Sequence, residues 1–150
     1  MTFNGSTSLK YVYIADDDED DRSFLSDAIL EIEPTVQLKE ALDGCHLLDI
    51  LTGLSAPLPD IIFLDINMPK MDGFQCLEQI RKAEGALKDV KIIMFSTSSD
   101  PDNIERALLL GADFYAVKPN SYNLLKSFLL DVLKADWHTA GNSHIKFRIL

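Results

Sequence analysis

The stretch IIFLDINMPKMDG, residues 61–73, joins four apolar residues to an aspartate and then to a turn containing Pro, Asp and Gly. A short apolar run bounded by polar loops is typical of a strand that is buried on both faces. Asp65 follows this run directly, and after the turn Phe74, Leu77 and Ile80 recur at helical spacing. The stretch therefore predicts a buried strand, a loop that begins with a carboxylate, and a helix.

The same alternation of short apolar runs and amphipathic stretches extends in both directions along the chain. Further strands are predicted at residues 11–15, 35–40, 90–95 and 114–117. Helical patterns follow the five strands near residues 24–32, 45–54, 74–80, 101–110 and 124–133. Apolar strands that alternate with helices indicate a parallel sheet covered on both faces. The predicted fold class is therefore α/β, with a doubly wound sheet of five strands.

The whole chain has 150 residues and is strongly acidic, with a formal net charge of −10 at pH 7. A chain of this length fits one domain with its own core, and its charge disfavours contact with nucleic acid. Its apolar runs are far shorter than the roughly 18 residues of a membrane span, and residues 1–8 carry no secretory signal pattern. We therefore expect a cytoplasmic protein that binds neither nucleic acid nor membrane directly.

Polar side chains follow four of the predicted strands. The carboxyl ends of parallel strands meet at one edge of the sheet, where ligands bind. The first strand delivers Asp16 and Asp17 to this edge, the third delivers Asp65, the fourth Ser96 and the fifth Lys118. Three carboxylates at short range repel one another, and one lysine cannot neutralise them. A divalent cation relieves this repulsion, and a site made of oxygen ligands favours Mg²⁺.

A carboxylate beside Mg²⁺, a hydroxyl and a lysine is suited to handling phosphate. Asp65 can act as a nucleophile and form an aspartyl phosphate. Mg²⁺ and Lys118 would offset charge on the transferred group, and the Ser96 hydroxyl would donate a hydrogen bond to a phosphoryl oxygen. The acidic residues 18–21, in contrast, are interpreted as a solvated helix N-terminus that the helix dipole stabilises.

Four motifs around these strand ends resemble the receiver domains of two-component response regulators. They are YIADDDEDD, IIFLDINMPKMDG, IIMFSTSS and GADFYAVKP, at residues 13–21, 61–73, 92–99 and 111–119. The resemblance extends over residues 9–135 and implies a flavodoxin-like sheet of order 2-1-3-4-5. Residues 1–8 are then an N-terminal extension, and residues 136–150 are a C-terminal tail.

The resemblance implies a role for each matching residue. Asp65 matches the phosphoacceptor, which takes its phosphoryl group from a histidine kinase or a histidine phosphotransfer protein. Asp16 and Asp17 match the acidic pair that positions Mg²⁺, with Asp17 as the direct ligand. Asn67 matches the residue whose backbone carbonyl binds the metal beside Asp65.

Further matching residues are implied to sense the phosphoryl group. Ser96 and Lys118 match the hydroxyl and the lysine that contact it. Ser96 and Tyr115 also match a switch pair, so phosphorylation is expected to draw Ser96 toward the phosphoryl group and to let Tyr115 turn inward. The peptide bond before Pro119 is implied to be cis.

The resemblance implies a phosphoprotein that catalyses only its own phosphorylation and dephosphorylation. Its output would be phosphorylation-dependent contact with a downstream protein, a homodimer or a phosphorelay, and the sequence does not choose among them.

An enzymatic alternative is an aspartate-nucleophile phosphatase of the haloacid-dehalogenase type. That mechanism needs a carboxylate two residues after the nucleophile, and Asn67 at that position cannot shuttle a proton. A receiver that forms part of a larger regulator is a further alternative.

Two features bear on partner contacts. Ile104, Ala107 and Leu108 fit an inward helix face, so Leu109 is expected to be exposed. In the tail, residues 144–150 alternate apolar and basic side chains with a period of two, which predicts a strand.

Overall fold

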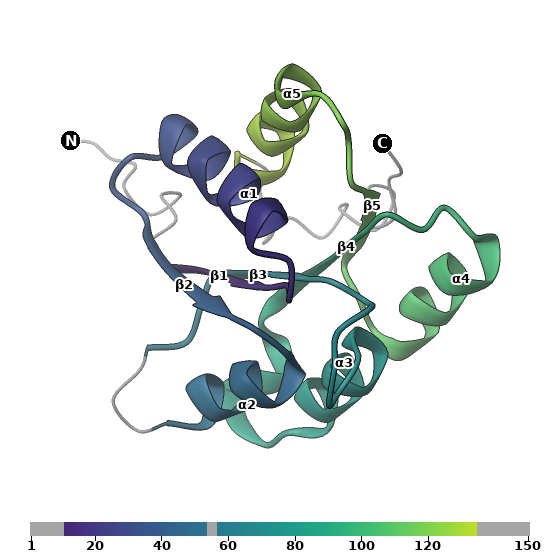
Figure 1. Cartoon of the computed structure of the whole chain (residues 1–150). Helices are drawn as coiled ribbons and strands as arrows, with labels where there is room; N and C mark the ends of the chain where they lie inside the picture. Colours follow the sequence, from purple (N-terminus) through teal and green to yellow (C-terminus); the bar gives the residue numbers. More distant parts are fainter. Residues whose placement is uncertain (1–10, 54–56, 135–150) are drawn as a thin grey trace.

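The structure is a computed structural model that describes residues 11–53 and 57–134 (Figure 1). Five parallel strands form one sheet in the order β2-β1-β3-β4-β5. The strands are β1 (Tyr11–Ala15), β2 (Gln37–Ala41), β3 (Ile61–Leu64), β4 (Lys91–Ser96) and β5 (Phe114–Val117). The predicted fold class and the strand order 2-1-3-4-5 are both confirmed.

Helices cover both faces of this sheet (Figure 1). On one face lie α1 (Glu19–Ile32) and α5 (Tyr122–Leu133). On the other face lie α2 (Gly44–Thr52), α3 (Gly73–Lys82) and α4 (Pro101–Leu110), and the short 3₁₀ helix η2 (Gly85–Asp89) connects α3 to β4. Each face therefore has an apolar core of its own.

Strand β3 shows how the two cores share the sheet. Ile61 and Phe63 pack with α1 and α5, whereas Ile62 and Leu64 belong to the core on the opposite face. All four side chains are at most 1% exposed. This double burial explains why the strand is apolar at every position instead of alternating between apolar and polar residues.

The edge strand β2 departs most from the prediction. It runs from Gln37 to Ala41 rather than over residues 35–40, and three of its five residues are exposed. β2 pairs with β1 only and leaves most of its side chains exposed, so its apolar signal is weak, whereas β5 at the other edge is mostly buried and keeps a continuous apolar run. The helix predicted at residues 45–54 is α2, which ends at Thr52.

Side-chain caps fix where each of the helices α1 to α5 begins. The capping residues, which accept a hydrogen bond from a backbone N–H in the first turn, are Asp18, Asp43, Asp72, Asp100 and Ser121. Such caps typically contribute about 1 kcal/mol each. Four of the chain's many aspartates therefore have a structural role at helix ends.

Gly73 brings the start of α3 against the end of β3. A Cβ atom at Gly73 would lie 2.1 Å from the carbonyl oxygen of Asp65, so a larger residue does not fit without a backbone shift. The Gly73 N–H donates to the carbonyl of Ile66 at 2.8 Å. This close approach holds the loop that carries Asp65.

Two details of the prediction are wrong. The bond before Pro119 is trans, as are all peptide bonds in the described ranges; a residue–proline bond favours trans by about 0.5–1 kcal/mol. Leu108 is 46% exposed rather than inward, because α4 packs mainly through Ala107 and partly through Ile104. Leu109 is 79% exposed, as predicted.

In residues 11–53 and 57–134, none of the helices combines the length and the apolar content that crossing a membrane requires. The strand pattern predicted at residues 144–150 lies outside the described residues.

Candidate functional site

The predicted site residues lie together at the carboxyl end of the sheet. Asp65 follows β3, and its N–H donates to the carbonyl of Ala15 at the end of β1, at 3.0 Å. Lys118 follows β5, and its N–H donates to the carbonyl of Ser96 at 2.7 Å. These bonds continue the parallel ladders one residue past the strands. The backbone therefore fixes where the Asp65 and Lys118 side chains begin.

Three carboxylates meet at this edge. Oxygen atoms of Asp16, Asp17 and Asp65 lie within 4.8 Å of one another. Asp16 and Asp65 are buried, whereas Asp17 is exposed to solvent. Asn67, two residues beyond Asp65, is also exposed. Three oxygen donors at this spacing, one of them open to water, suit a hard divalent cation such as Mg²⁺, which keeps several water ligands.

Lys118 is the cation that faces these carboxylates. Its Nζ lies 2.7 Å from Asp16 Oδ2, 2.8 Å from Asp21 Oδ2 and 3.6 Å from Asp65 Oδ2. Burial by itself lowers the pKa of Lys118, but hydrogen bonds to Asp16 and Asp21 and the charge of Asp65 outweigh burial and raise it. Lys118 is therefore fully protonated at neutral pH, and it is shared among three carboxylates.

The Asp65 carboxyl is held in an environment that disfavours its charge. Burial raises the pKa of Asp65 to about 7, and the charges of Asp16 and Asp17 act in the same direction. Lys118 and the Ile66 N–H, which donates to Asp65 Oδ1 at 2.9 Å, only partly oppose this shift. A cation that binds here must therefore displace a proton near neutral pH.

This environment predicts a pH-dependent stability in the absence of divalent cations. The pKa of Asp65 is about 7 in the fold against an ordinary 3.8, so the folded chain binds more protons between these values. Its free energy of unfolding should then fall as pH rises from about 4 to 7. We expect Asp65→Asn to be more stable than the wild type by about 1–3 kcal/mol at pH 8, with the difference vanishing near pH 4.

Urea titrations of both proteins in EDTA at several pH values measure this difference. The exposed Asp27→Asn serves as a control for removing a charge elsewhere, and its effect should not follow the same pH dependence. A stability difference between Asp65→Asn and the wild type that is constant with pH would contradict the shifted pKa.

Ser96 and Tyr115 are linked through one loop residue. Ser96 is fully buried, and its Oγ accepts a hydrogen bond from the Ser98 N–H at 3.2 Å. Tyr115 is also fully buried, and its hydroxyl donates to the Ser98 carbonyl at 2.7 Å. The Tyr115 ring therefore already lies inside in this structure, and the expected response of Ser96 and Tyr115 to phosphorylation stays a prediction. The Ser98 carbonyl satisfies the hydroxyl and makes this burial favourable.

Two residues at this site, Asp21 and Arg22, were not predicted from the sequence. Asp21, interpreted as part of a solvated helix start, contacts Lys118. Arg22 donates through Nη1 to the backbone carbonyl of Asp16 at 2.8 Å and through Nε to Glu40 at 3.1 Å. The sequence contained a signal for Asp21. This residue lies in the first turn of a helix that Asp18 caps, and helical side chains lean toward the helix N-terminus, which for α1 is the end beside Lys118.

Comparisons with known proteins point to one protein family. The response regulator receiver domain family matches residues 12–129. The probable transcriptional regulator ycf27 of Guillardia theta is 35% identical over 134 residues, which are 89% of this chain and 49% of that protein. The chemotaxis protein CheY of Treponema pallidum is 34% identical over 118 residues, 77% of this chain and 79% of that protein. The chain thus spans about half of the first relative and most of the second.

Solved structures show the same fold. The crystal structure of the Mn²⁺-bound form of the response regulator Rcp1 has a TM-score of 0.76 to this chain. It is 22% identical, and the match covers 87% of this chain and 99% of that one.

Proposed function

The chain belongs to the family of response regulator receiver domains, and we propose that its Asp65 accepts a phosphoryl group from a histidine kinase or a histidine phosphotransfer protein. One observation carries this proposal. Asp16, Asp17 and Asp65, from the ends of two strands, lie within 4.8 Å of one another, and the Lys118 ammonium from a third strand is 3.6 Å from Asp65. This is a nucleophile surrounded by the groups that phosphoryl transfer requires.

The proposal includes a Mg²⁺ site made by Asp16, Asp17, Asp65 and the backbone carbonyl of Asn67. The all-oxygen donor set supports it, as does the crowding of three carboxylates around one lysine. The Mn²⁺-bound structure of Rcp1, which shares the fold, is a further support. When bound, the metal supplies positive charge that offsets the charge of the phosphoryl oxygens.

The protein's own residues supply the remaining steps. An oxygen of Asp65 attacks phosphorus as the bond from phosphorus to the donor's imidazole nitrogen breaks, and that nitrogen keeps the electron pair. Lys118 donates a hydrogen bond to a phosphoryl oxygen and offsets its charge. Ser96 Oγ accepts from Ser98, so its own hydroxyl proton can be donated to another phosphoryl oxygen.

Receiver domains are in general phosphoacceptors and not enzymes that turn over a separate substrate. We extend this to the present chain and propose that it signals in the cytoplasm by phosphorylation-dependent contact with a downstream protein, through a homodimer or in a phosphorelay. The net charge of −10 supports a protein partner over direct contact with nucleic acid. The phosphatase alternative is disfavoured by Asn67, which cannot act as a general acid.

Treatment with acetyl phosphate and Mg²⁺ tests the proposal. We expect a single phosphoryl group per chain to accumulate as an acyl phosphate that hydroxylamine releases. Incubation with p-nitrophenyl phosphate should rapidly release no more than about one equivalent of p-nitrophenol per chain, because each chain has a single phosphoacceptor. Rapid release of many equivalents, with no acyl phosphate accumulating, would instead support the phosphatase.

A further inference from the structure

Asp21 is tied to the site by a closed ring of hydrogen bonds. Lys118 Nζ donates to Asp21 Oδ2 at 2.8 Å and to Asp16 Oδ2 at 2.7 Å. Asp16 Oδ1 accepts from the Asp18 N–H at 2.9 Å, and Asp18 Oδ1 accepts from the Asp21 N–H at 3.0 Å. The first turn of α1 is therefore fastened to the end of β5 through Lys118.

The two hydrogen-bonded partners of Lys118 differ in exposure. The Asp21 side chain is 42% exposed, whereas that of Asp16 is 6% exposed. Water can solvate the Asp21 carboxylate when Lys118 moves away, but loss of Lys118 would leave the Asp16 carboxylate buried without this partner. The contact with Asp21 is therefore the one that Lys118 can exchange more readily.

Lys118 has a reason to make this exchange when Asp65 is modified. At 3.6 Å its Nζ is beyond hydrogen-bond distance of Asp65. A phosphoryl group on Asp65 would extend toward it with several strong acceptor oxygens and a charge near −2. A hydrogen bond from an ammonium to such an oxygen is charge-assisted and stronger than one to a solvated carboxylate.

We propose that Asp21 is a positioning residue that holds Lys118 on the α1 side of the pocket and is exchanged for a phosphoryl oxygen when Asp65 is phosphorylated. The proposal rests on the proposed function of Asp65. It has two consequences. The Lys118–Asp21 contact opposes phosphorylation because Lys118 must give it up, and giving it up frees the Asp21 carboxylate at the exposed start of α1.

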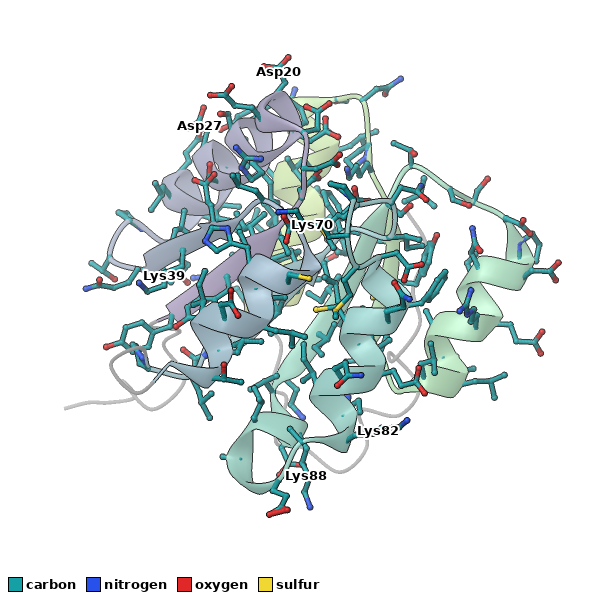
Figure 2. All side chains as sticks on the ribbon, turned by 60° about the horizontal axis from the view of Figure 1, so that its bottom comes forward. Asp20, Asp27, Lys39, Lys70, Lys82 and Lys88 are labelled. Carbon is teal, nitrogen blue, oxygen red and sulfur yellow. The ribbon has the colours of Figure 1, made fainter. Side chains whose placement is uncertain are left out.

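Beryllofluoride, which binds an aspartate as a mimic of a phosphoryl group, tests this at equilibrium in excess Mg²⁺. We expect Asp21→Asn to bind it roughly two- to fivefold more tightly than the wild type, a size typical of an exposed ion pair. The matched control is Asp20→Asn. Asp20 lies in the same first turn and carries the same charge, but it is exposed and points away from the body of the protein (Figure 2). Its substitution should have the smaller effect.

An affinity of Asp21→Asn that equals or falls below that of Asp20→Asn would overturn the role of Asp21. Asp65→Asn should bind no beryllofluoride. If it binds as well as the wild type, or if the wild type binds none, the proposed function fails, whatever Asp21 does. Thermal unfolding of each variant checks that it is folded.

A second measurement uses the wild-type protein and does not depend on any variant folding. The ¹H–¹⁵N nuclear magnetic resonance signal of the Lys118 ammonium and the side-chain carboxyl ¹³C signal of Asp21 report on their contact. We expect both signals to move when beryllofluoride and Mg²⁺ are added. If the Asp21 carboxyl signal stays at its starting position while the Asp65 site fills, the exchange does not occur.

Discussion

Replacement of Asp65 by asparagine should abolish phosphorylation by acetyl phosphate, with a loss in rate of more than about 1,000-fold. Asparagine keeps the size and shape of the side chain, but its amide carries no negative charge with which to attack phosphorus. The other groups around Asp65, namely Lys118, Asp16 and Ser96, remain in place in this variant. The loss would therefore report on the nucleophile alone.

The rate is measured from the accumulation of acyl phosphate over time in excess Mg²⁺. Asp27→Asn is the matched control, since Asp27 is an exposed aspartate on α1 that projects into solvent (Figure 2). It should be labelled at a rate close to that of the wild type. Labelling of Asp65→Asn at that same rate would place the phosphoryl group elsewhere and contradict the proposed function.

Removal of divalent cations should slow phosphorylation of the wild type by about 100- to 1,000-fold. The reason is the charge at the site. Asp16, Asp17 and Asp65 lie within 4.8 Å of one another, and Lys118, which faces them, is also bound by Asp21. A phosphodonor adds further negative charge. Without a cation, the pKa of about 7 also leaves much of Asp65 protonated at neutral pH, and a protonated carboxyl is a poor nucleophile.

A titration of the rate with Mg²⁺ after treatment with EDTA measures this dependence, with K⁺ at matched ionic strength as the control. We expect K⁺ to restore little of the rate. Asp17→Asn, which removes the exposed ligand, should shift the titration to higher Mg²⁺ concentration. Equal rates in EDTA and in Mg²⁺ would contradict the metal site.

Strands β1, β3 and β5 could be predicted residue by residue and β4, at residues 91–96 rather than 90–95, to within one residue, whereas the exposed edge strand β2 could not. Strands β1, β3 and β5 are bounded as the apolar runs indicated, because burial on both faces leaves a continuous signal. β2 has three exposed residues among its five, so neither its first nor its last residue could be located from the pattern. The helical pattern likewise placed Leu108 on the inward face of α4, but the residue is exposed, because contacts with neighbouring elements decide which side chains are covered.

The carboxylates and the lysine of the candidate site could be predicted because each comes directly after a strand. Strand order then places Asp16, Asp65 and Lys118 at one edge without any knowledge of side-chain contacts. Asp21 could not be placed in this way, because its contact with Lys118 depends on the cap at Asp18 and on the direction of α1. The burial of Tyr115 likewise depends on a loop carbonyl that no sequence pattern identifies.

The most direct measurement is the position of the phosphoryl group in the chain. Borohydride reduces an aspartyl phosphate to homoserine, and mass spectrometry of the resulting peptides locates the reduced residue. After treatment with acetyl phosphate and Mg²⁺, we expect homoserine in place of Asp65 and no reduction there when Mg²⁺ is withheld. Homoserine in place of Asp16, Asp17 or Asp21, with Asp65 unmodified, would contradict the assignment of Asp65 as the phosphoacceptor.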